Sequence, residues 1–173
     1  YGISKRLHSK EVGIPVLRMG NIQNDRIDFT TLKYAKLSNE KSDNVLLRPG
    51  DILFNRTNSL DLVGKVAIVK EERPLSFASY LLRLRTNGKA ISEWLFRRMA
   101  ASDTRQRLRS IATPGVSQVN INPTQMRELL IAVPERSEQK AIIASGEEFD
   151  DLLDTQKDKL GGLGQIKNGL IQN

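Results

Sequence analysis

The 173-residue sequence contains no cysteine and only one histidine, His8. Without cysteine there is no disulfide framework and no thiol nucleophile, and a single histidine leaves no His/Cys cluster for zinc. There is no signal peptide and no apolar run of about 18 residues, so we expect a soluble, cytoplasmic protein. The sequence begins at Tyr1 instead of methionine, as expected of a piece of a longer protein.

Aromatic residues are scarce, with one Trp, three Tyr and five Phe, which argues against a platform on which the bases of a single strand stack. Recognisable catalytic patterns are missing as well. Gly64-Lys65 lacks the preceding glycine of a phosphate-binding loop, and His8 and Ser59 have no visible partner for a hydrolytic triad. We therefore predict a non-catalytic protein without a metal or a cofactor.

The net charge of +7 is unevenly distributed along the chain. Residues 135–173 hold five basic and eight acidic side chains, a net charge of −3. Residues 1–134 hold the other 22 basic and 12 acidic side chains and therefore carry a net charge of +10. A basic region of this kind is the electrostatic footprint expected of a protein that binds a polyanion. Lysine-rich surfaces also promote solubility, so the charge supports nucleic-acid binding only in part.

Four short runs in the basic region are rich in β-forming residues: residues 14–19, 51–55, 63–69 and 77–85. Apolar and polar residues alternate at the ends of the later runs, as in half-buried antiparallel strands. After Asn87 the apolar residues recur at helical intervals as far as Ile111, with Gly88 or Ser92 as start signals. The basic region is therefore predicted to have an α+β fold, mixed and mainly antiparallel, with short helices.

A second helix start lies near the end of this region. Asn122 is a typical N-cap, Pro123 suits the first helical position, and Gln125 is placed to complete a capping box. We expect a short helix through Leu129 and then a strand over residues 130–133.

From Glu135 onward the pattern becomes that of a long, coiled-coil-like helix. Apolar residues recur at seven-residue steps and on an adjoining seam, with Gln156 at one step. These residues are Ile142, Phe149, Leu152, Leu163, Ile166 and Leu170. The stripe requires either a partner helix or folding back onto the chain's own domain. Gly161, Gly162 and Gly164 predict a bend, fraying or a close contact between helices.

Residues 47–59 join a turn at Pro49-Gly50 to an apolar strand that ends in polar side chains. Asn55, Arg56 and Asn58 follow or end this strand, and Arg and Asn can form paired hydrogen bonds with guanine and adenine edges. A solvated loop with bonds between side chains and backbone would also account for this run.

Several ordered motifs together resemble the specificity subunit of type I DNA restriction-modification enzymes. They cover residues 13–22, 47–59, 63–65, 77–81, 115–123 and 134–142. In that family a subunit has two target recognition domains, each followed by a long helix, and the two helices pair antiparallel as a spacer. Each domain reads half of a split double-stranded DNA target. Methyltransferase subunits dock on the assembly, and through them a motor and nuclease subunit joins.

The resemblance implies that this chain is a half subunit. Residues 1–134 would form a DNA target recognition domain and residues 135–173 a spacer and dimerisation helix, paired with a second copy or with another half subunit. Two alternatives stay open: a recognition domain from a fused restriction-modification methyltransferase, and an assembly protein whose basic face meets an acidic protein.

Candidate DNA-binding residues follow from the side-chain types and the motifs. The candidate base readers are Arg18, Asn21, Arg56, Asn58, Ser117 and Gln118. The candidate phosphate contacts are Lys5, Arg6, Lys10, Arg105 and Arg109. The six apolar residues of the C-terminal stripe are the candidate dimerisation residues.

Overall fold

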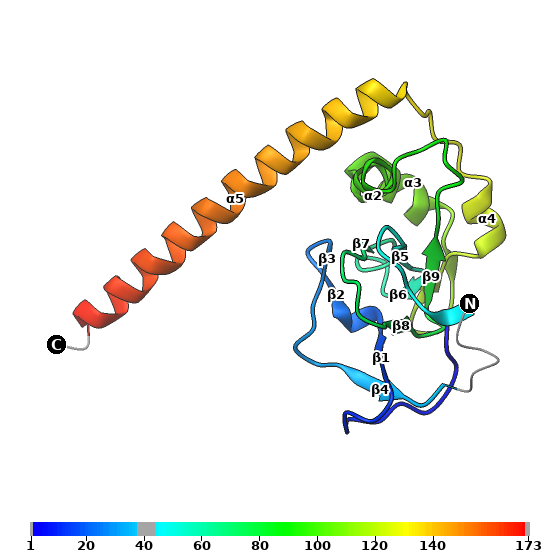
Figure 1. The fold of residues 1–173 in the computed structure, drawn as a ribbon, viewed down its shortest axis with the longest axis horizontal. Helices are drawn as coiled ribbons and strands as arrows, with labels where there is room; N and C mark the ends of the chain where they lie inside the picture. The colour runs from blue at the N-terminus through cyan, green and yellow to red at the C-terminus, as the bar shows by residue number, and fades with distance from the viewer. Residues whose placement is uncertain (1, 38–43, 172–173) are drawn as a thin grey trace. The chain divides into compact units, whose positions relative to one another are not determined.

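The computed structural model describes residues 2–37 and 44–171, with side chains as far as residue 161 (Figure 1). It divides the chain into two compact units, Tyr1–Val133 and Pro134–Asn173. The first unit contains all the described strands and several short helices, and the second contains one long helix. The predicted α+β class with mainly antiparallel strands and a long C-terminal helix is confirmed.

Two three-stranded sheets form the centre of the first unit. In one, β5 lies between β7 and β9, and both pairings are antiparallel. In the other, β1 pairs antiparallel with β4 and parallel with β8. The strands are β1 (Ile14–Leu17), β4 (Lys33–Ala35), β5 (Ile52–Asn55), β7 (Val66–Ile68), β8 (Ser76–Phe77) and β9 (Leu81–Leu84).

Smaller elements surround these sheets. A short 3-10 helix, η1, leads into the β2–β3 hairpin, and β10, β11 and β6 form a further antiparallel sheet. The elements are η1 (Met19–Asn21), β2 (Ile22–Gln23), β3 (Arg26–Ile27), β6 (Thr57–Asn58), β10 (Thr113–Pro114) and β11 (Val119–Asn120).

The buried strand β5 separates two parts of the core. Leu53 packs in one apolar cluster with Leu17 and Phe77. Ile52 and Phe54 face the other way and belong to a second cluster. Side chains of a strand alternate between its faces, so a fully buried run such as Ile52–Asn55 must be covered on both sides.

The helical region after Asn87 forms two helices, α2 (Ser92–Ala100) and α3 (Ser102–Ser110), where the sequence predicted one segment. Ala101 is extended and separates them. Met99 and Leu108 are both buried in the second cluster. In one continuous helix, nine residues at about 100° each would place them on opposite sides. The break lets both face the core, and Arg98 spans it by donating two hydrogen bonds to Asp103, at 2.9 and 2.6 Å.

The predicted N-cap of the next helix, α4 (Pro123–Arg127), is confirmed. The Asn122 side chain accepts a hydrogen bond from the Thr124 N–H, and Gln125 accepts one from the Asn122 N–H. The helix ends at Arg127 instead of Leu129. The strand predicted for residues 130–133 does not form: these residues pair with no described strand, and Leu130 and Val133 are exposed. A β-forming run becomes a strand only where another strand accepts its hydrogen bonds.

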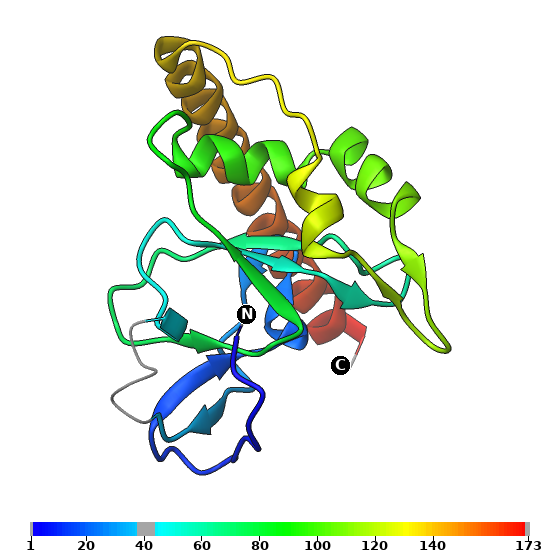
Figure 2. The same ribbon diagram turned by 90° about the vertical axis from the view of Figure 1, so that its right-hand side faces the viewer.

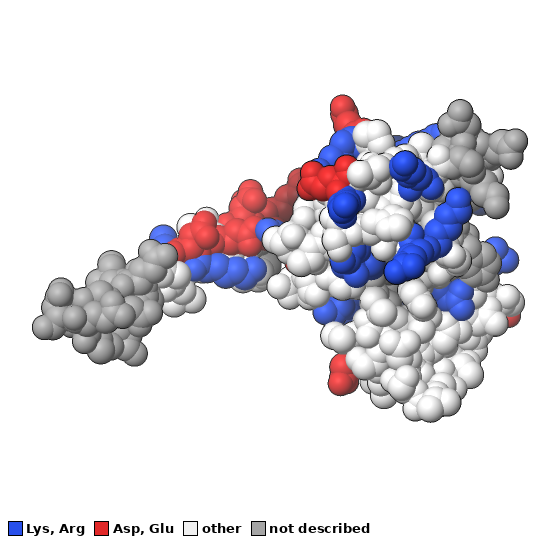
Figure 3. Space-filling view, turned by 90° about the horizontal axis from the view of Figure 1, so that it is seen from below, with Lys and Arg blue, Asp and Glu red and all other residues white. Residues whose placement is uncertain are grey.

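The second unit is dominated by α5 (Arg136–Ile171), a helix of 36 residues that continues through the glycine cluster. At about 1.5 Å per residue it is roughly 54 Å long. Carboxylates are prominent along it in Figure 3. No helix within the described residues is long and apolar enough to cross a membrane.

Candidate nucleic-acid interface

The small sheet β10-β11-β6 brings together two of the segments that the sequence singled out. Thr57 lies opposite Asn120 and Asn58 lies opposite Val119, so residues 56–58 and the 115–120 segment are neighbours in space. Figure 2 shows the β10–β11 hairpin, in lime green, projecting from one side of the first unit. Four of the six candidate base readers, Arg56, Asn58, Ser117 and Gln118, therefore belong to one continuous structure.

Asn120 connects β11 to the Arg56–Thr57 segment through its side chain. Its Oδ1 accepts hydrogen bonds from Arg56 Nε at 3.1 Å and Arg56 Nη2 at 2.9 Å, and a third from Thr57 Oγ1 at 2.8 Å. The backbone continues the connection, since the Ile121 N–H donates to the Arg56 carbonyl at 2.8 Å. Arg56 is half-buried and its guanidinium is held in a defined direction. An orientated guanidinium at a domain surface is suited to reading a guanine edge.

Asn120 was not among the sequence-based candidates. Apolar and polar residues alternate from Val119 to Asn122, as in a half-buried strand, and this pattern does not single out Asn120. Its partner Arg56 lies 64 residues earlier in the chain, so the contact depends on the tertiary structure.

The hairpin tip carries Ser117 and Gln118. Residues 113–118 are all exposed, so both side chains are accessible to a ligand. Their backbone is fixed by the Gly115 N–H, which donates to the Gln118 carbonyl at 2.8 Å. Asn58 is half-buried, and its Oδ1 accepts a hydrogen bond from the Ser59 N–H at 2.9 Å.

Arg18 and Asn21 lie elsewhere, at the two ends of η1: Arg18 is its N-cap and Asn21 its last residue. Asn21 is fully buried, and its amide group accepts from the Arg18 N–H and donates to the Asp28 carbonyl at 2.9 Å. It offers no surface to a base in this conformation and serves the fold instead. Arg18 Nη2 donates to the Thr31 carbonyl at 3.0 Å. These two residues stabilise the loop after β3, and we do not retain Asn21 as a base reader.

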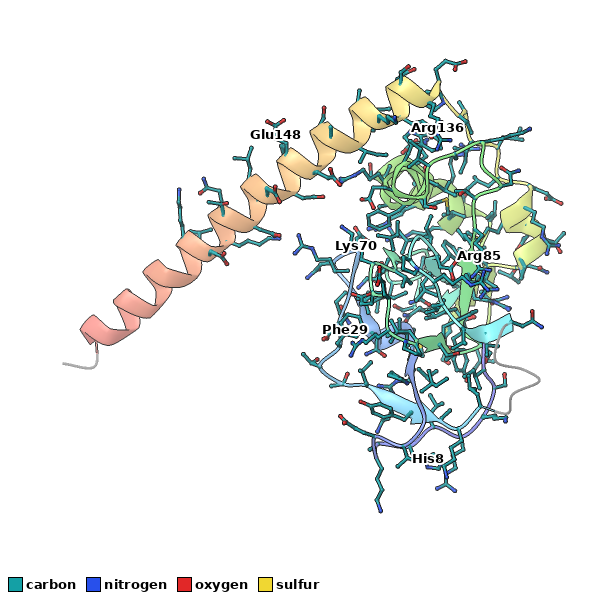
Figure 4. The ribbon with its side chains drawn as sticks, in the orientation of Figure 1. His8, Phe29, Lys70, Arg85, Arg136 and Glu148 are labelled. Atoms are coloured by element: carbon teal, nitrogen blue, oxygen red, sulfur yellow. The ribbon has the colours of Figure 1, made fainter. Side chains whose placement is uncertain are left out.

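The candidate phosphate contacts fall into two groups. Arg105 forms an ion pair with Asp25, which joins α3 to the β2–β3 hairpin, and Arg109 donates to the Asp61 carbonyl at 2.9 Å. Lys5, Arg6 and Lys10 are exposed on the N-terminal segment. Figure 4 labels His8 of that segment at the end of the unit away from the helices. The structure therefore does not bring all five residues to one face.

A further basic cluster surrounds the buried carboxylate of Asp51. Arg85 donates to it through Nε at 2.5 Å and Nη2 at 2.9 Å, and Arg83 Nε lies 4.0 Å from it. The Asp51 carboxylate also accepts a hydrogen bond from the Arg48 N–H, so it anchors the turn at Pro49-Gly50. Burial and the neighbouring Arg85 charge lower the pKa of Arg83, whereas the hydrogen bond from Arg85 to Asp51 raises the pKa of Arg85.

Basic side chains gather on the face of the first unit shown in Figure 3. Within the described residues, no group of three or more His, Cys, Asp and Glu side chains could hold a metal ion. The accessible chemistry of this unit is that of hydrogen-bond donors, acceptors and positive charge.

Comparison with known proteins identifies the family. The family model of the type I restriction modification DNA specificity domain matches residues 3–170, nearly the whole chain. The chain belongs to this family. The resemblance seen in the sequence motifs is thereby confirmed, and the family supplies DNA sequence specificity to type I restriction-modification systems.

Specificity subunits are among the relatives. The chain is 31% identical to a protein assigned as the type I restriction enzyme MjaX specificity subunit of Methanocaldococcus jannaschii, over 99% of this chain and 41% of that protein. It is 23% identical to the EcoKI specificity subunit of Escherichia coli, over 96% of this chain and 37% of that protein. The chain thus spans about two fifths of the length of these relatives.

A solved structure shares the fold. It comes from work on complex assembly and conformational transition of the type I R-M system. The match has a TM-score of 0.66 at 16% identity and covers 91% of this chain and 36% of the other.

Proposed function

We propose that this chain is a non-catalytic specificity component that reads one half of a bipartite DNA target. Residues 1–134 form the target recognition domain, and residues 135–173 form a helix that spaces and pairs two such domains. Methyltransferase subunits dock on the pair and supply the chemistry, and a motor and nuclease subunit joins through them. The relatives support this role, because they are named as specificity subunits and are more than twice as long as this chain.

The observation that carries the proposal is the sheet β10-β11-β6 on a strongly basic unit. Arg56 is orientated by Asn120, while Ser117 and Gln118 are exposed beside it. Positive charge supplies affinity for phosphates that does not depend on sequence, and orientated polar side chains supply discrimination between bases. Both properties are needed for a target recognition domain.

The apolar stripe of α5 supports pairing with a second copy. Phe149, Leu152 and Leu160 are exposed at 63%, 60% and 67%. Leu163, Ile166 and Leu170 lie beyond the side chains that the structure describes. Several apolar residues of α5 lie at equal distances before and after Gln156: Phe149 corresponds to Leu163, and Leu152 to Leu160, a leucine outside the stripe. In a two-fold antiparallel pair centred on Gln156, Phe149 of one helix would lie opposite Leu163 of the other, so apolar side chains would meet.

Charge and glycine placement also favour the antiparallel arrangement. A parallel pair would place the carboxylates of residues 147–154 against each other, whereas the antiparallel pair places them against residues 158–165. A Cβ added at Gly161 would meet nothing within 4 Å, so the helix itself does not require glycine there. Close approach of a second helix would require it.

Electrophoretic titration of duplex DNA at several salt concentrations tests the proposal. We expect the logarithm of affinity to fall with the logarithm of salt concentration with a slope of about −4, as for four to five phosphate contacts. Arg56→Ala should reduce discrimination between target and mismatched duplex by about 1–3 kcal/mol. Lys5→Ala, the control, should weaken binding to all sequences equally. A slope near zero would refute the DNA-binding role.

Methyltransferase docking requires a separate experiment. The full chain, mixed with the methyltransferase subunit of its own system, should form a complex on gel filtration and direct methylation to one DNA sequence. Methylation of that sequence by the methyltransferase subunit alone would contradict the assignment.

A further inference from the structure

Val116 occupies the end of the β10–β11 hairpin and is fully exposed. With Ser117 it forms the two-residue loop that is closed by the hydrogen bond from Gly115 to Gln118. Such loops favour Gly, Asn and Asp, and a β-branched residue is a poor choice for a turn. Val116 also packs in none of the three core clusters of the described residues. Neither the turn nor the core explains this side chain.

The tip is held in a fixed shape at both ends of the hairpin. A Cβ at Gly115 would lie 2.8 Å from the Gln118 carbonyl oxygen, so only glycine allows the two strands to approach this closely. At the other end, Asn120 is bound to Arg56 and Thr57, and Ile121 is fully buried. A side chain at the tip is therefore presented in a defined position, which reduces the entropy lost on binding.

The strand order indicates which kind of ligand fits the hairpin. β10 is an edge strand, and its Pro114 has no N–H to donate. Proline at an edge opposes the addition of another strand, which is a common way for a protein to bind a sheet. A two-stranded β-ribbon fits the DNA major groove, which is about 12 Å wide. The exposed Ser117 and Gln118 beside Val116 can form hydrogen bonds with base edges there.

We propose that the hairpin enters the major groove tip first and that Val116 makes an apolar contact with the C5-methyl group of a thymine. This inference rests on the proposed function and adds a residue that determines specificity. The methyl group is the only apolar feature of the base-pair edges in the major groove, and it distinguishes thymine from the other bases. Val116 would therefore favour an A·T pair through the methyl group of its thymine.

A coupled substitution in protein and DNA tests the contact. Wild-type full-length chain first selects its preferred duplex from a randomised pool. Each thymine of that duplex is then replaced by uracil, which removes only the methyl group. At one thymine we expect uracil to weaken wild-type binding about three- to fivefold, as for one buried methyl group. Val116→Ser should bind the thymine and uracil duplexes equally. Val12→Ser is the control, because Val12 is another exposed valine, 48% accessible.

The outcomes separate this inference from the proposed function. If selection yields no preferred sequence, the proposed function fails. If a sequence is selected but no uracil effect depends on Val116, the inference fails and the proposed function stands. Unchanged DNA binding by Val116→Ser, together with weaker assembly with the methyltransferase subunit, would assign Val116 to a protein contact and would also overturn the inference.

Discussion

Replacement of Asn120 tests whether the base-reading structure is held as described. Asn120→Ala removes one oxygen that accepts two hydrogen bonds from Arg56 and one from Thr57. A hydrogen bond to a charged group contributes about 1.5–3 kcal/mol and a neutral one about 0.5–1.5 kcal/mol. The three bonds share a single acceptor, and both donors are only half-buried, so they do not add fully. We expect the free energy of unfolding to fall by about 1.5–3 kcal/mol.

Urea unfolding followed by tryptophan fluorescence measures this loss. Trp94 is the only tryptophan and is buried in the first unit, so its emission reports unfolding of that unit. Asn120→Asp is the matched control. It retains the acceptor oxygen and should preserve stability, but its charge should hold Arg56 more tightly and reduce DNA discrimination. A change below about 0.5 kcal/mol in Asn120→Ala would refute the role of Asn120 in positioning Arg56.

Three further predictions concern other parts of the molecule. The hydrogen bond from Arg98 lowers the pKa of Asp103 to about 2. The ionised Asp103 carboxylate therefore stabilises the fold above about pH 4, and this contribution is lost as the pH falls to 2. Carboxyl NMR titration should show this midpoint, and Arg98→Ala should move it toward 4; an unchanged midpoint would contradict the cause. Asp51→Asn leaves Arg83 and Arg85 without their buried carboxylate and should reduce stability by about 1–3 kcal/mol in the same urea assay. This is less than the roughly 3–5 kcal/mol expected for a fully buried pair, because the Arg85 side chain is 42% exposed. Phe149→Asp combined with Leu152→Asp should give a folded monomer by light scattering, whereas Ala144→Asp, off the stripe, should remain dimeric; a monomeric wild-type chain at tens of micromolar would exclude the pairing.

Local signals predicted some elements well. The cap of α4 was predictable because Asn122, Pro123 and Gln125 act within one turn of helix. The long helix α5 was predictable from its apolar repeat. The break at Ala101 was not predicted, although Met99 and Leu108 differ in helical phase, because no proline or glycine marks it. The absence of a strand at residues 130–133 was not predicted either, because strand formation depends on a partner strand that the run itself does not specify.

In the candidate site, too, some features were predictable from local sequence and others depend on contacts between distant segments. Arg56 and Asn58 were identified because their side-chain types follow a buried strand, and the structure places them beside the 115–120 hairpin. Asn21 has the same side-chain chemistry, but burial commits its amide to the fold. The sequence contains the residue types, whereas burial and the bond between Arg56 and Asn120 depend on contacts between distant segments.

The central claim is that this chain recognises a DNA sequence. The most direct measurement is the ratio of its affinities for the selected duplex and for a scrambled duplex of equal length and composition, at one salt concentration near 0.15 M. Sequence recognition through base contacts predicts at least a tenfold preference, since each lost base contact costs about 1–3 kcal/mol. Equal affinity for the two duplexes would contradict the claim, because binding would then rest on phosphate contacts alone.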